Sequence, residues 1–450
     1  MKPTLSFHLA TLALLSLAGG LAQSAPPQSA STNAAPSTDV SAARLPSDWV
    51  EPATGHRVIR LSPEVGGASL YFHQRAYTPE GDKLVIHTRE GIVVVDLTAL
   101  GASPPKRELI MPNARCIATA WRTREAYVRQ DNAIVAVHLD TKMVREVVKL
   151  PPQARGRGAA FALNCDETLL VGIAPDPDGK TVPRTPPPGS GGDSLEAGWA
   201  AGTPKMIYVV NVKTGELKVL RRGNDWFNHL QCSPTDPQQI LFCHEGPWHY
   251  VDRTWTIRVD GTPARLLHER TMNMEIEGHE FFSADGKTVW FDLQTPRSTV
   301  FWLAGVELAT GQRTRYHLRR DEWSVHFNVS PDGKLFAGDG GGPGSVAAQS
   351  PDGQRLDPPG NGQWIYLFRP VMVRGSSFRE NKDLIDVGYF QSERLVNMAN
   401  HNYSKNGGVE PNVTFTPDGK WIVFSGNFHS NPGRGRATTH TYAVEIAKAK

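Results

Sequence analysis

Two histidines and an arginine stand at the ends of three short apolar runs in the middle of the chain. His229 opens the first run, His244 closes the second, and Arg253 directly precedes the third. A Ser-Pro-Thr-Asp-Pro breaker at residues 233–237 separates the first two runs, which predicts a hairpin of two short strands. Polar side chains at the strand ends of a rigid sheet are well placed to converge on a ligand. We therefore expect a chemical site at one end of this hairpin.

The polar turn of this hairpin recurs along the chain. Each copy lies between two short apolar runs, and the copies fall at residues 78–81, 233–236, 283–286, 330–333 and 416–419, with degenerate copies at 121–124 and 164–167. Several neighbouring copies lie about 40 to 50 residues apart, which is the period of a propeller blade. Longer gaps contain insertions, notably the Pro/Gly-rich stretch 175–202. Together the copies indicate about seven units.

Further apolar runs complete these units, at residues 92–95, 134–137, 207–210, 254–257, 300–303 and 364–367. Almost no stretch has the pattern of a long amphipathic helix. The runs at residues 57–61 and 441–446 are expected to share one blade, which would close the ring and remove its open edges. The sequence thus predicts an all-β fold, a seven-bladed β-propeller.

Polar residues stand at the expected start of the innermost strands, five positions before the turn proline or its equivalent. The six positions are Gln74, Ala160, His229, His279, His326 and Asn412. In a propeller these starts surround the axis at one face, so residues far apart in sequence approach one another. Histidine, glutamine and asparagine gathered in this way predict a cation site. A histidine that opens a blade can also simply hydrogen-bond its own sheet, but three in register favour the site.

Two further candidates lie on the loop before the last unit. His401 and Glu410 bracket a Lys-Asn-Gly-Gly stretch at residues 405–408. A loop of this composition could reach over a site or could be merely solvated. Glu280, next to His279, is expected on the opposite face of its strand and in a structural role.

The N-terminus has the pattern of an export signal. Met1 and Lys2 precede an apolar run at residues 9–21, and small residues follow it. We expect a signal peptide at residues 1–25, a disordered Ala/Ser/Pro-rich linker at 26–48 and the propeller at 49–450. The apolar run is too short to span a membrane. The protein is therefore expected to be periplasmic or secreted.

Charge and cysteine content narrow the class of partner. A net charge of +3 and a pI near 8.6 are too mild for a nucleic-acid binder but tolerate an acidic substrate. The four cysteines have no CxxC spacing. Cys232 and Cys243 could pair in an oxidising compartment or could be two buried thiols, and the second alternative is favoured.

The motifs of the central region resemble the oligogalacturonate lyase family. The resemblance is carried by Cys-His-Glu-Gly-Pro-Trp at 243–248, Val-Asp-Arg-Thr-Trp at 251–255, Gly-His-Glu-Phe at 278–281, His-Phe at 326–327 and Gly-Asp-Gly at 338–340. It extends over nearly the whole chain after residue 48. It implies a seven-bladed propeller that cleaves short uronic-acid oligosaccharides by β-elimination with a divalent cation, typically manganese. It also implies that His244 is the catalytic base and that His279 binds the metal.

The chain departs from the family pattern before the last turn. The family has a His-Pro-His-Pro run there, whose two histidines bind the metal, whereas this chain has Glu410-Pro411-Asn412. Oxygen donors suit harder cations, so calcium or magnesium becomes an alternative to manganese. The cation could also be recruited through His326 or His401. The substrate could also be a glycan that contains a uronate other than galacturonate.

These residues give a mechanistic hypothesis. A cation held by His279 with some of His326, His401, Glu410 and Asn412 binds the uronate carboxylate, Arg253 adds positive charge, and neutral His244 takes the C5 proton. The expected substrate contacts are His229, Gln74, Trp248 and Glu410. The alternative is a non-catalytic propeller of the TolB type that binds a glycan or a protein, because the turn motifs alone do not require catalysis. The sequence indicates no oligomeric state.

Overall fold

A computed structural model describes residues 46–155, 160–186, 194–342, 345–350, 352, 354–356, 363–374, 381, 383–403, 409–428 and 438–449. The expected signal peptide, and the expected linker as far as residue 45, lie outside the described residues. The compact unit that contains the described residues is Leu45–Lys450. Within the described ranges, no helix is both long and apolar enough to cross a membrane.

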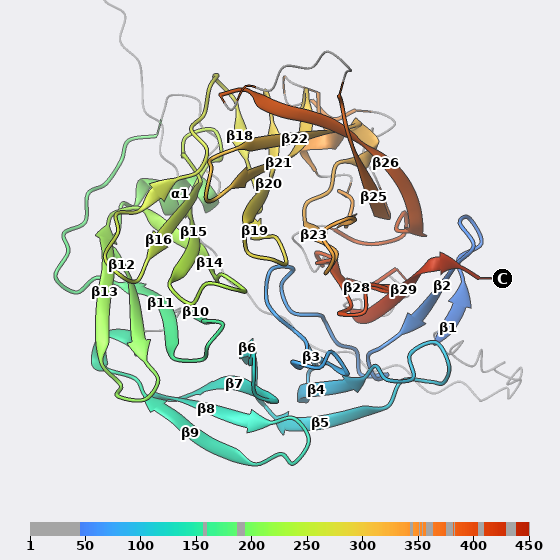
Figure 1. Cartoon of the computed structure of the whole chain (residues 1–450), viewed down its shortest axis with the longest axis horizontal. Helices are drawn as coiled ribbons and strands as arrows, with labels where there is room; N and C mark the ends of the chain where they lie inside the picture. The colour runs from blue at the N-terminus through green and yellow to red at the C-terminus, as the bar shows by residue number, and fades with distance from the viewer. Residues whose placement is uncertain are drawn as a thin grey trace, which may run out of the picture. The chain divides into compact units, whose positions relative to one another are not determined.

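Short antiparallel strands make up this unit, and they pair into sheets that lie around a common centre (Figure 1). Three sheets each hold four consecutive strands: β6 (Cys116–Thr119), β7 (Glu125–Gln130), β8 (Ala133–His138) and β9 (Val144–Lys149); β10 (Ala160–Leu163), β11 (Leu169–Pro175), β12 (Lys205–Asn211) and β13 (Leu217–Gly223); β14 (Trp226–Cys232), β15 (Gln239–Glu245), β16 (Thr254–Arg258) and β17 (Arg265–Leu266). A three-stranded sheet holds β3 (Lys83–His87), β4 (Gly91–Asp96) and β5 (Arg107–Pro112). The fold is all-β and propeller-like, as the turn repeats predict.

A nine-stranded sheet joins two antiparallel runs. The first run holds β18 (Ile276–Glu277), β19 (Phe281–Phe282), β20 (Thr288–Gln294), β21 (Phe301–Glu307) and β22 (Arg313–Leu318). The second holds β23 (Phe327–Val329), β24 (Phe336–Gly338), β25 (Trp364–Met372) and β26 (Ile385–Asn397). The outer strands β22 and β26 pair in parallel, from Arg313 opposite Ile385 to His317 opposite Tyr389.

The two ends of the described unit share one sheet. It holds β1 (Asp48–Val50), β2 (His56–Arg60), β27 (Thr414–Phe415), β28 (Trp421–Gly426) and β29 (His440–Lys448). Ile59 lies opposite Ala443 in the antiparallel pair of β2 and β29. This pairing confirms the predicted closure of the ring by both ends of the chain, which leaves fewer open strand edges.

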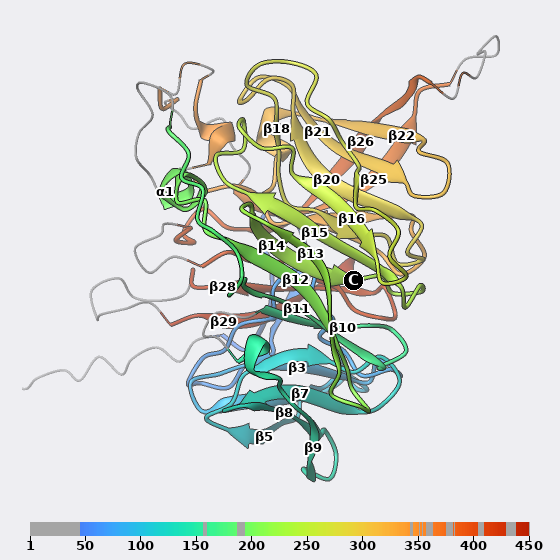
Figure 2. The same cartoon turned by 90° about the vertical axis from the view of Figure 1, so that its left-hand side faces the viewer.

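Helices are few and short. The only α-helix among the described residues is α1 (Ser194–Ala200), which lies in the insertion between β11 and β12 and is seen at the left of Figure 2. Single turns of 3-10 helix occur at Pro152–Ala154, Arg320–Glu322 and Val346–Ala348. The helix packs on Trp226, because a Cβ atom at Gly198 would lie 2.2 Å from the indole.

Apolar strands pack between neighbouring sheets. The Ile-Val-Val-Val run of β4, for example, is buried on both faces, and β-branched side chains of this kind suit a pleated sheet that is covered on both sides. One cluster combines side chains of β3, β4, β6, β7 and β28, so adjacent sheets share their cores. The short inner strands β6, β19 and β23 lie nearest the centre in Figure 1.

The four cysteines are free and buried. Cys243 lies opposite Asn228 across the β14–β15 pair, whereas Cys232 lies opposite Ile240. The two thiols therefore stand at different levels of the hairpin. This confirms the alternative of two buried thiols and contradicts the disulfide.

Candidate functional site

Four imidazoles form what we call the central histidine group: His73, His229, His279 and His326. The ring centroids of His279 and His326 lie 4.5 Å apart, those of His229 and His279 5.6 Å, and those of His73 and His229 5.7 Å. His229 belongs to β14, His279 precedes β19, and His326 directly precedes β23. The starts of the inner strands thus do bring the three predicted histidines together, and they add a fourth.

A buried aspartate stands behind each of two histidines. The backbone N–H of His279 donates to Asp292 Oδ1 at 2.6 Å, and its Nδ1 lies 3.4 Å from the same oxygen. The backbone N–H of His326 donates to Asp339 Oδ1 at 2.9 Å, and its Nδ1 lies 2.7 Å from Asp339 Oδ2. Asp339 at Nδ1 fixes the ring of His326, as is usual for metal-binding histidines, whereas Nδ1 of His279 is buried without a hydrogen-bond partner among the described residues.

The first of these aspartates depends on a glycine. A Cβ atom at Gly278 would lie 2.0 Å from Asp292 Oδ1, so only glycine lets the carboxylate reach the His279 backbone. Burial raises the pKa of Asp292 to about 7. Burial, followed by the neighbouring imidazoles, holds the pKa of His279 well below its usual range. Burial also lowers the pKa of His326, but the charge and hydrogen bond of Asp339 more than offset it, and the net shift is upward.

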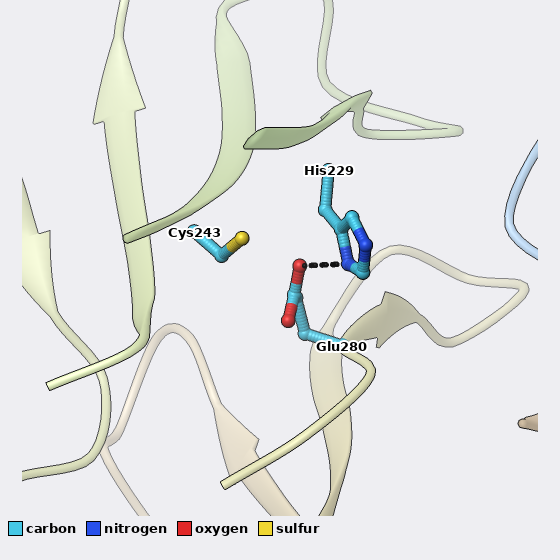
Figure 3. A group of neighbouring side chains, drawn as sticks. All are labelled: His229, Cys243 and Glu280. Carbon is cyan, nitrogen blue, oxygen red and sulfur yellow. Dashed lines mark ion pairs between the residues drawn. The ribbon is translucent and has the colours of Figure 1, made fainter. Parts of the chain in front are cut away.

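An ion-pair network lies beside His229, at a bulge in β14 where His229 has φ 46°. Bulges next to functional sites commonly redirect a side chain. The Arg253 guanidinium is 1% exposed and donates to Glu245 Oε1 at 2.8 Å and to Glu280 Oε2 at 3.1 Å. His229 Nδ1 lies 2.9 Å from Glu280 Oε1 (Figure 3). Arg253 is therefore enclosed by carboxylates instead of facing a ligand.

Figure 3 also shows Cys243 next to the His229–Glu280 pair. These three are the only group of three or more potential metal ligands in the described part of the chain whose ligand atoms all lie within 4.8 Å of one another. Burial alone would raise the pKa of Glu280, but the charges of Arg253 and His229 outweigh it and lower the pKa to about 2. Burial holds the Cys243 pKa well above its usual range. The carboxylate is thus committed to Arg253 and the thiol stays protonated, so the group is a structural network.

The rim of the central histidine group is formed by other predicted residues. Glu410 is 55% exposed, and its Oε2 lies 3.8 Å from His326 Nε2, which also meets the Tyr71 hydroxyl at 3.2 Å. The ring edge of Trp248 faces His279 at 6.2 Å. Asn412 joins backbone to backbone: its Oδ1 accepts from the Phe72 N–H at 3.2 Å and its Nδ2 donates to the Glu410 carbonyl at 2.8 Å.

Two predicted residues have other partners. Gln74 Oε1 accepts from the Tyr71 N–H at 3.1 Å, and Gln74 lines a cavity of about 350 Å³ whose walls come from the inner strands. His401 Nε2 lies 2.7 Å from the Val409 carbonyl, and its Nδ1 accepts from the Asn427 N–H at 3.2 Å. Both ring nitrogens are therefore used by the backbone, and the geometry assigns His401 to its own loop instead of to a cation. Residues 405–408 of that loop lie outside the described residues.

His244 lies in a second region, which we call the His244 pocket, with Asp225, Arg221, Arg184 and Trp255. Alternation along β15 puts His244 on the opposite face from Cys243 and Glu245. Its ring stacks on Trp255 at 4.9 Å, and the Arg221 guanidinium lies 5.4 Å from the same indole. Burial lowers the pKa of His244 to about 4. Within the described residues, no ring contact joins His244 to the central histidine group.

Several residues of both regions escaped the sequence prediction. They are His73, Tyr71, Asp292, Asp339 as a histidine partner, Arg221 and Asp225. The aspartates do have a sequence signal, because each follows its histidine by 13 positions in two successive units. Arg221 and Asp225 have none, since their proximity to His244 arises from the packing of β13 and the following turn on the next sheet.

The fold and the site together indicate the class of protein, an all-β propeller-like enzyme whose imidazoles gather at the starts of the inner strands. The model of the oligogalacturonate lyase family matches residues 47–440. The chain belongs to this family and is therefore a polysaccharide lyase.

Similar proteins cover most of the chain. An oligogalacturonide lyase of Pectobacterium atrosepticum is 25% identical over 398 residues, and an oligogalacturonate lyase of Dickeya dadantii is 24% identical over 390; each alignment covers 85% of this chain and 93% of the relative. Two solved structures are similar in fold: an oligogalacturonate lyase in complex with manganese (TM-score 0.66, 21% identity) and one from Vibrio parahaemolyticus (TM-score 0.68, 19% identity). Each covers 89% of this chain and 96% of the other.

Proposed function

We propose that this lyase cleaves short oligogalacturonides, or oligosaccharides of a closely related uronate, by β-elimination, with a divalent cation at the central histidine group. One observation carries the cation site: His279 and His326 lie 4.5 Å apart, and each has a buried aspartate beside its Nδ1. The hydrogen bond between Asp339 and Nδ1 gives the His326 ring a fixed direction, and within the described ranges His279 keeps both ring nitrogens without a hydrogen bond to another side chain. Two imidazoles and a carboxylate are suitable donor types for such a cation, and their ligand atoms would have to move closer together on binding, because in the described part of the chain they do not form a group within 4.8 Å.

The donors fit a divalent cation of intermediate hardness. His279, His326 and Glu410 would hold it, with His326 Nε2 exchanging its contact with the Tyr71 hydroxyl for the cation, whereas both ring nitrogens of His401 are bonded to the backbone and the Asn412 side chain bridges two backbone groups. A set of imidazole and carboxylate suits manganese better than calcium, whose ligands are oxygens. The relative solved with manganese supports this choice. Bound there, a divalent cation would neutralise the uronate carboxylate and make the C5 proton more acidic.

His244 is the proposed base. Its pKa of about 4 keeps the imidazole neutral at neutral pH. The C5–H bond breaks as a new N–H bond forms on His244, the electron pair becomes the C4=C5 double bond, and the C4–O4 bond breaks. Water, or the proton returned from His244, protonates the leaving O4. Because the carboxyl carbon is bonded to C5, the cation and His244 would have to act on the same sugar ring, which would lie beside the loop between β15 and β16, whose Trp248 contacts His279.

Arg221 is proposed as the cation that faces substrate in the His244 pocket, in place of Arg253. No carboxylate of the described residues lies within ion-pair distance of Arg221, and its buried Nε has no hydrogen-bond partner. Arg253, in contrast, is already matched by Glu245 and Glu280. A free guanidinium near the reacting carbon can bind a uronate carboxylate or stabilise the developing negative charge.

The number of blades is also part of the proposal. If the nine-stranded sheet is divided at the parallel β22–β26 pair, each half has the antiparallel order of one blade, and the ring then has seven blades.

We further propose that residues 1–25 direct export and that 26–48 link them to the propeller at 49–450. N-terminal sequencing of the exported protein would locate the cleavage site.

Near-ultraviolet absorbance tests the proposed reaction, because elimination creates a conjugated double bond. Oligogalacturonides, rhamnogalacturonan and ulvan are mixed with the protein, with and without a chelator and with added Mn²⁺, Mg²⁺ or Ca²⁺. We expect a rise with oligogalacturonides that the chelator suppresses and Mn²⁺ restores. A rise that the chelator leaves unchanged would contradict the cation, and no rise on any glycan would contradict the lyase and favour a binding propeller.

A further inference from the structure

The two ring nitrogens of His244 have different surroundings. Nε2 is enclosed and has no hydrogen-bond partner, and the closest acidic atom to it is Asp225 Oδ2 at 4.0 Å. Nδ1 has no hydrogen-bond partner among the described residues either, but it is not among the enclosed atoms. A neutral imidazole carries one proton, and its surroundings decide which nitrogen holds it. His244 therefore has one nitrogen facing a carboxylate and one left for a reactant.

Asp225 is held in place through Oδ1, the carboxylate oxygen that does not face His244. Arg184 Nη2 donates to Asp225 Oδ1 at 2.8 Å, and Arg184 Nη1 donates to the Trp199 carbonyl at 3.0 Å. The guanidinium also lies 5.4 Å from the Trp199 ring. With Oδ1 bound to Arg184, the second oxygen of Asp225 is the one that faces His244.

The insertion that carries Arg184 is docked on the strand of His244. The Arg184 backbone N–H donates to the Ala200 carbonyl at 2.8 Å, which ties this segment to the end of α1. A Cβ atom at Gly246, which has φ 154°, would lie 3.0 Å from Trp199 Cδ1. Glycine at this position therefore lets α1 approach the end of β15 closely, and the insertion fixes the distance between Arg184, Asp225 and His244.

We propose that Asp225, held by Arg184, is a positioning residue that keeps the proton of neutral His244 on Nε2, so that Nδ1 is the nitrogen that takes the C5 proton. The proposal rests on the proposed function in one respect, the assignment of His244 as the base. When the C5–H bond breaks and the Nδ1–H bond forms, the imidazolium carries both protons and Asp225 stabilises its charge. The electron pair passes into the C4=C5 bond as O4 leaves. A carboxylate on the non-reacting nitrogen serves a catalytic histidine in the same way in the Ser-His-Asp triad.

The distance of 4.0 Å is longer than a hydrogen bond. Catalytic contacts of this kind are often long without substrate and shorten in the complex. Without substrate, Asp225 influences the His244 ring through its negative charge and not through a hydrogen bond. The other charged groups that act on His244 are Arg221 of β13, Arg184 of the insertion and Asp252 before β16. The two aspartates raise the His244 pKa and the two arginines lower it.

The tautomer of His244 tests the proposal without any assay of activity. Nitrogen NMR of the full chain labelled with ¹⁵N-histidine separates N–H from bare ring nitrogens, and His244→Gln identifies the signals by their loss. We expect the Nε2–H tautomer in the native protein and a shift toward Nδ1–H in Asp225→Asn. The matched control is Asp252→Asn, because Asp252 is already bound by Arg270 at 2.9 Å, and it should leave the tautomer unchanged. A native Nδ1–H tautomer, or an unchanged tautomer in Asp225→Asn, would overturn the proposal.

Kinetics add an effect that a merely structural role would not produce. Asp225→Asn is expected to lower kcat by on the order of 10- to 100-fold with little change in KM, a smaller loss than in the triad because the contact is longer. Arg184→Gln removes a charge that lowers the His244 pKa, so the acid limb of kcat/KM should move to higher pH. If Asp225→Asn does not fold, the absence of that movement in Arg184→Gln would refute the coupling. Retained activity in His244→Ala would instead refute the base assignment, whatever the tautomer.

Discussion

The central histidine group and the His244 pocket differ in how their imidazoles are held, although His279 Nδ1, like His244 Nε2, is buried without a hydrogen-bond partner among the described residues. In the central group, His326 Nδ1 is held by Asp339 at 2.7 Å and His229 Nδ1 by Glu280 at 2.9 Å. In the pocket, neither nitrogen of His244 is hydrogen-bonded within the described ranges, and Arg221 lacks a carboxylate. Fixed rings suit a site that binds a ligand in one geometry. An unbonded ring suits a group that must change its protonation state.

The two regions nevertheless share one strand. At the end of β15, Cys243 and Glu245 face the ion-pair network of His229, and His244 points to the other face. Three consecutive residues therefore supply both regions, because side chains alternate along a strand. A substrate that reaches from one region to the other would have to pass the loop that begins after Glu245, where Trp248 lies.

Replacing one histidine from each region should separate the two roles. We expect His244→Ala to lower kcat by on the order of 10² to 10⁴, the usual contribution of a general base, with unchanged affinity for Mn²⁺. His279→Ala should lose activity and Mn²⁺ affinity together. Absorbance at saturating substrate and calorimetric titration of Mn²⁺ measure the two quantities. Equal loss of Mn²⁺ affinity in both variants would contradict the division into two regions.

Replacing Arg253 and Arg221 should likewise separate a structural role from a role in activity. Arg253→Met leaves Glu245 and Glu280 buried without their partner, and breaking a buried ion pair costs about 3–5 kcal/mol. Within the described part of the chain, Arg221→Gln loses only ring contacts, worth about 1 kcal/mol or less, but should lower kcat/KM. Denaturant unfolding followed by circular dichroism measures the first effect and the absorbance assay the second. A stable, inactive Arg253→Met would return the substrate-facing role to Arg253.

Local patterns predicted the fold well. The turn repeats located the strand pairs, and counting back from each turn found His229, His279 and His326, because register relative to a turn is a short-range property. The same count gave Gln74, yet His73 joins the group. The segment before β3 folds back on itself there, with the Gln74 N–H on the Tyr71 carbonyl at 2.8 Å, so the register of a strand does not apply.

Partners from distant strands were beyond the sequence. Arg253 is a visible cation, but its neutralisation depends on Glu245 and Glu280 meeting it in the folded sheet. Whether a carboxylate pairs with Arg221 is likewise decided by which strands lie next to it in the folded protein. His244 was a different case: alternation through Cys243, His244 and Glu245 was enough to place it on the opposite face from its neighbours, but not to show what covers that face.

The pH profile gives the smallest and most specific contrast between the regions. Because burial lowers the His244 pKa from 6.5 to about 4, the base is neutral above pH 4, and kcat/KM should rise with pH through about 4 and be flat at neutral pH. An acid limb near 6.5 would show a solvated imidazole and contradict the enclosed pocket.

His244 binds a proton more readily in the unfolded chain, so its contribution to stability is complete above pH 6.5 and declines as the pH falls toward 4. Circular dichroism at each pH separates this loss of fold from the titration of the base, and His244→Gln, which cannot titrate there, should lose the stability change.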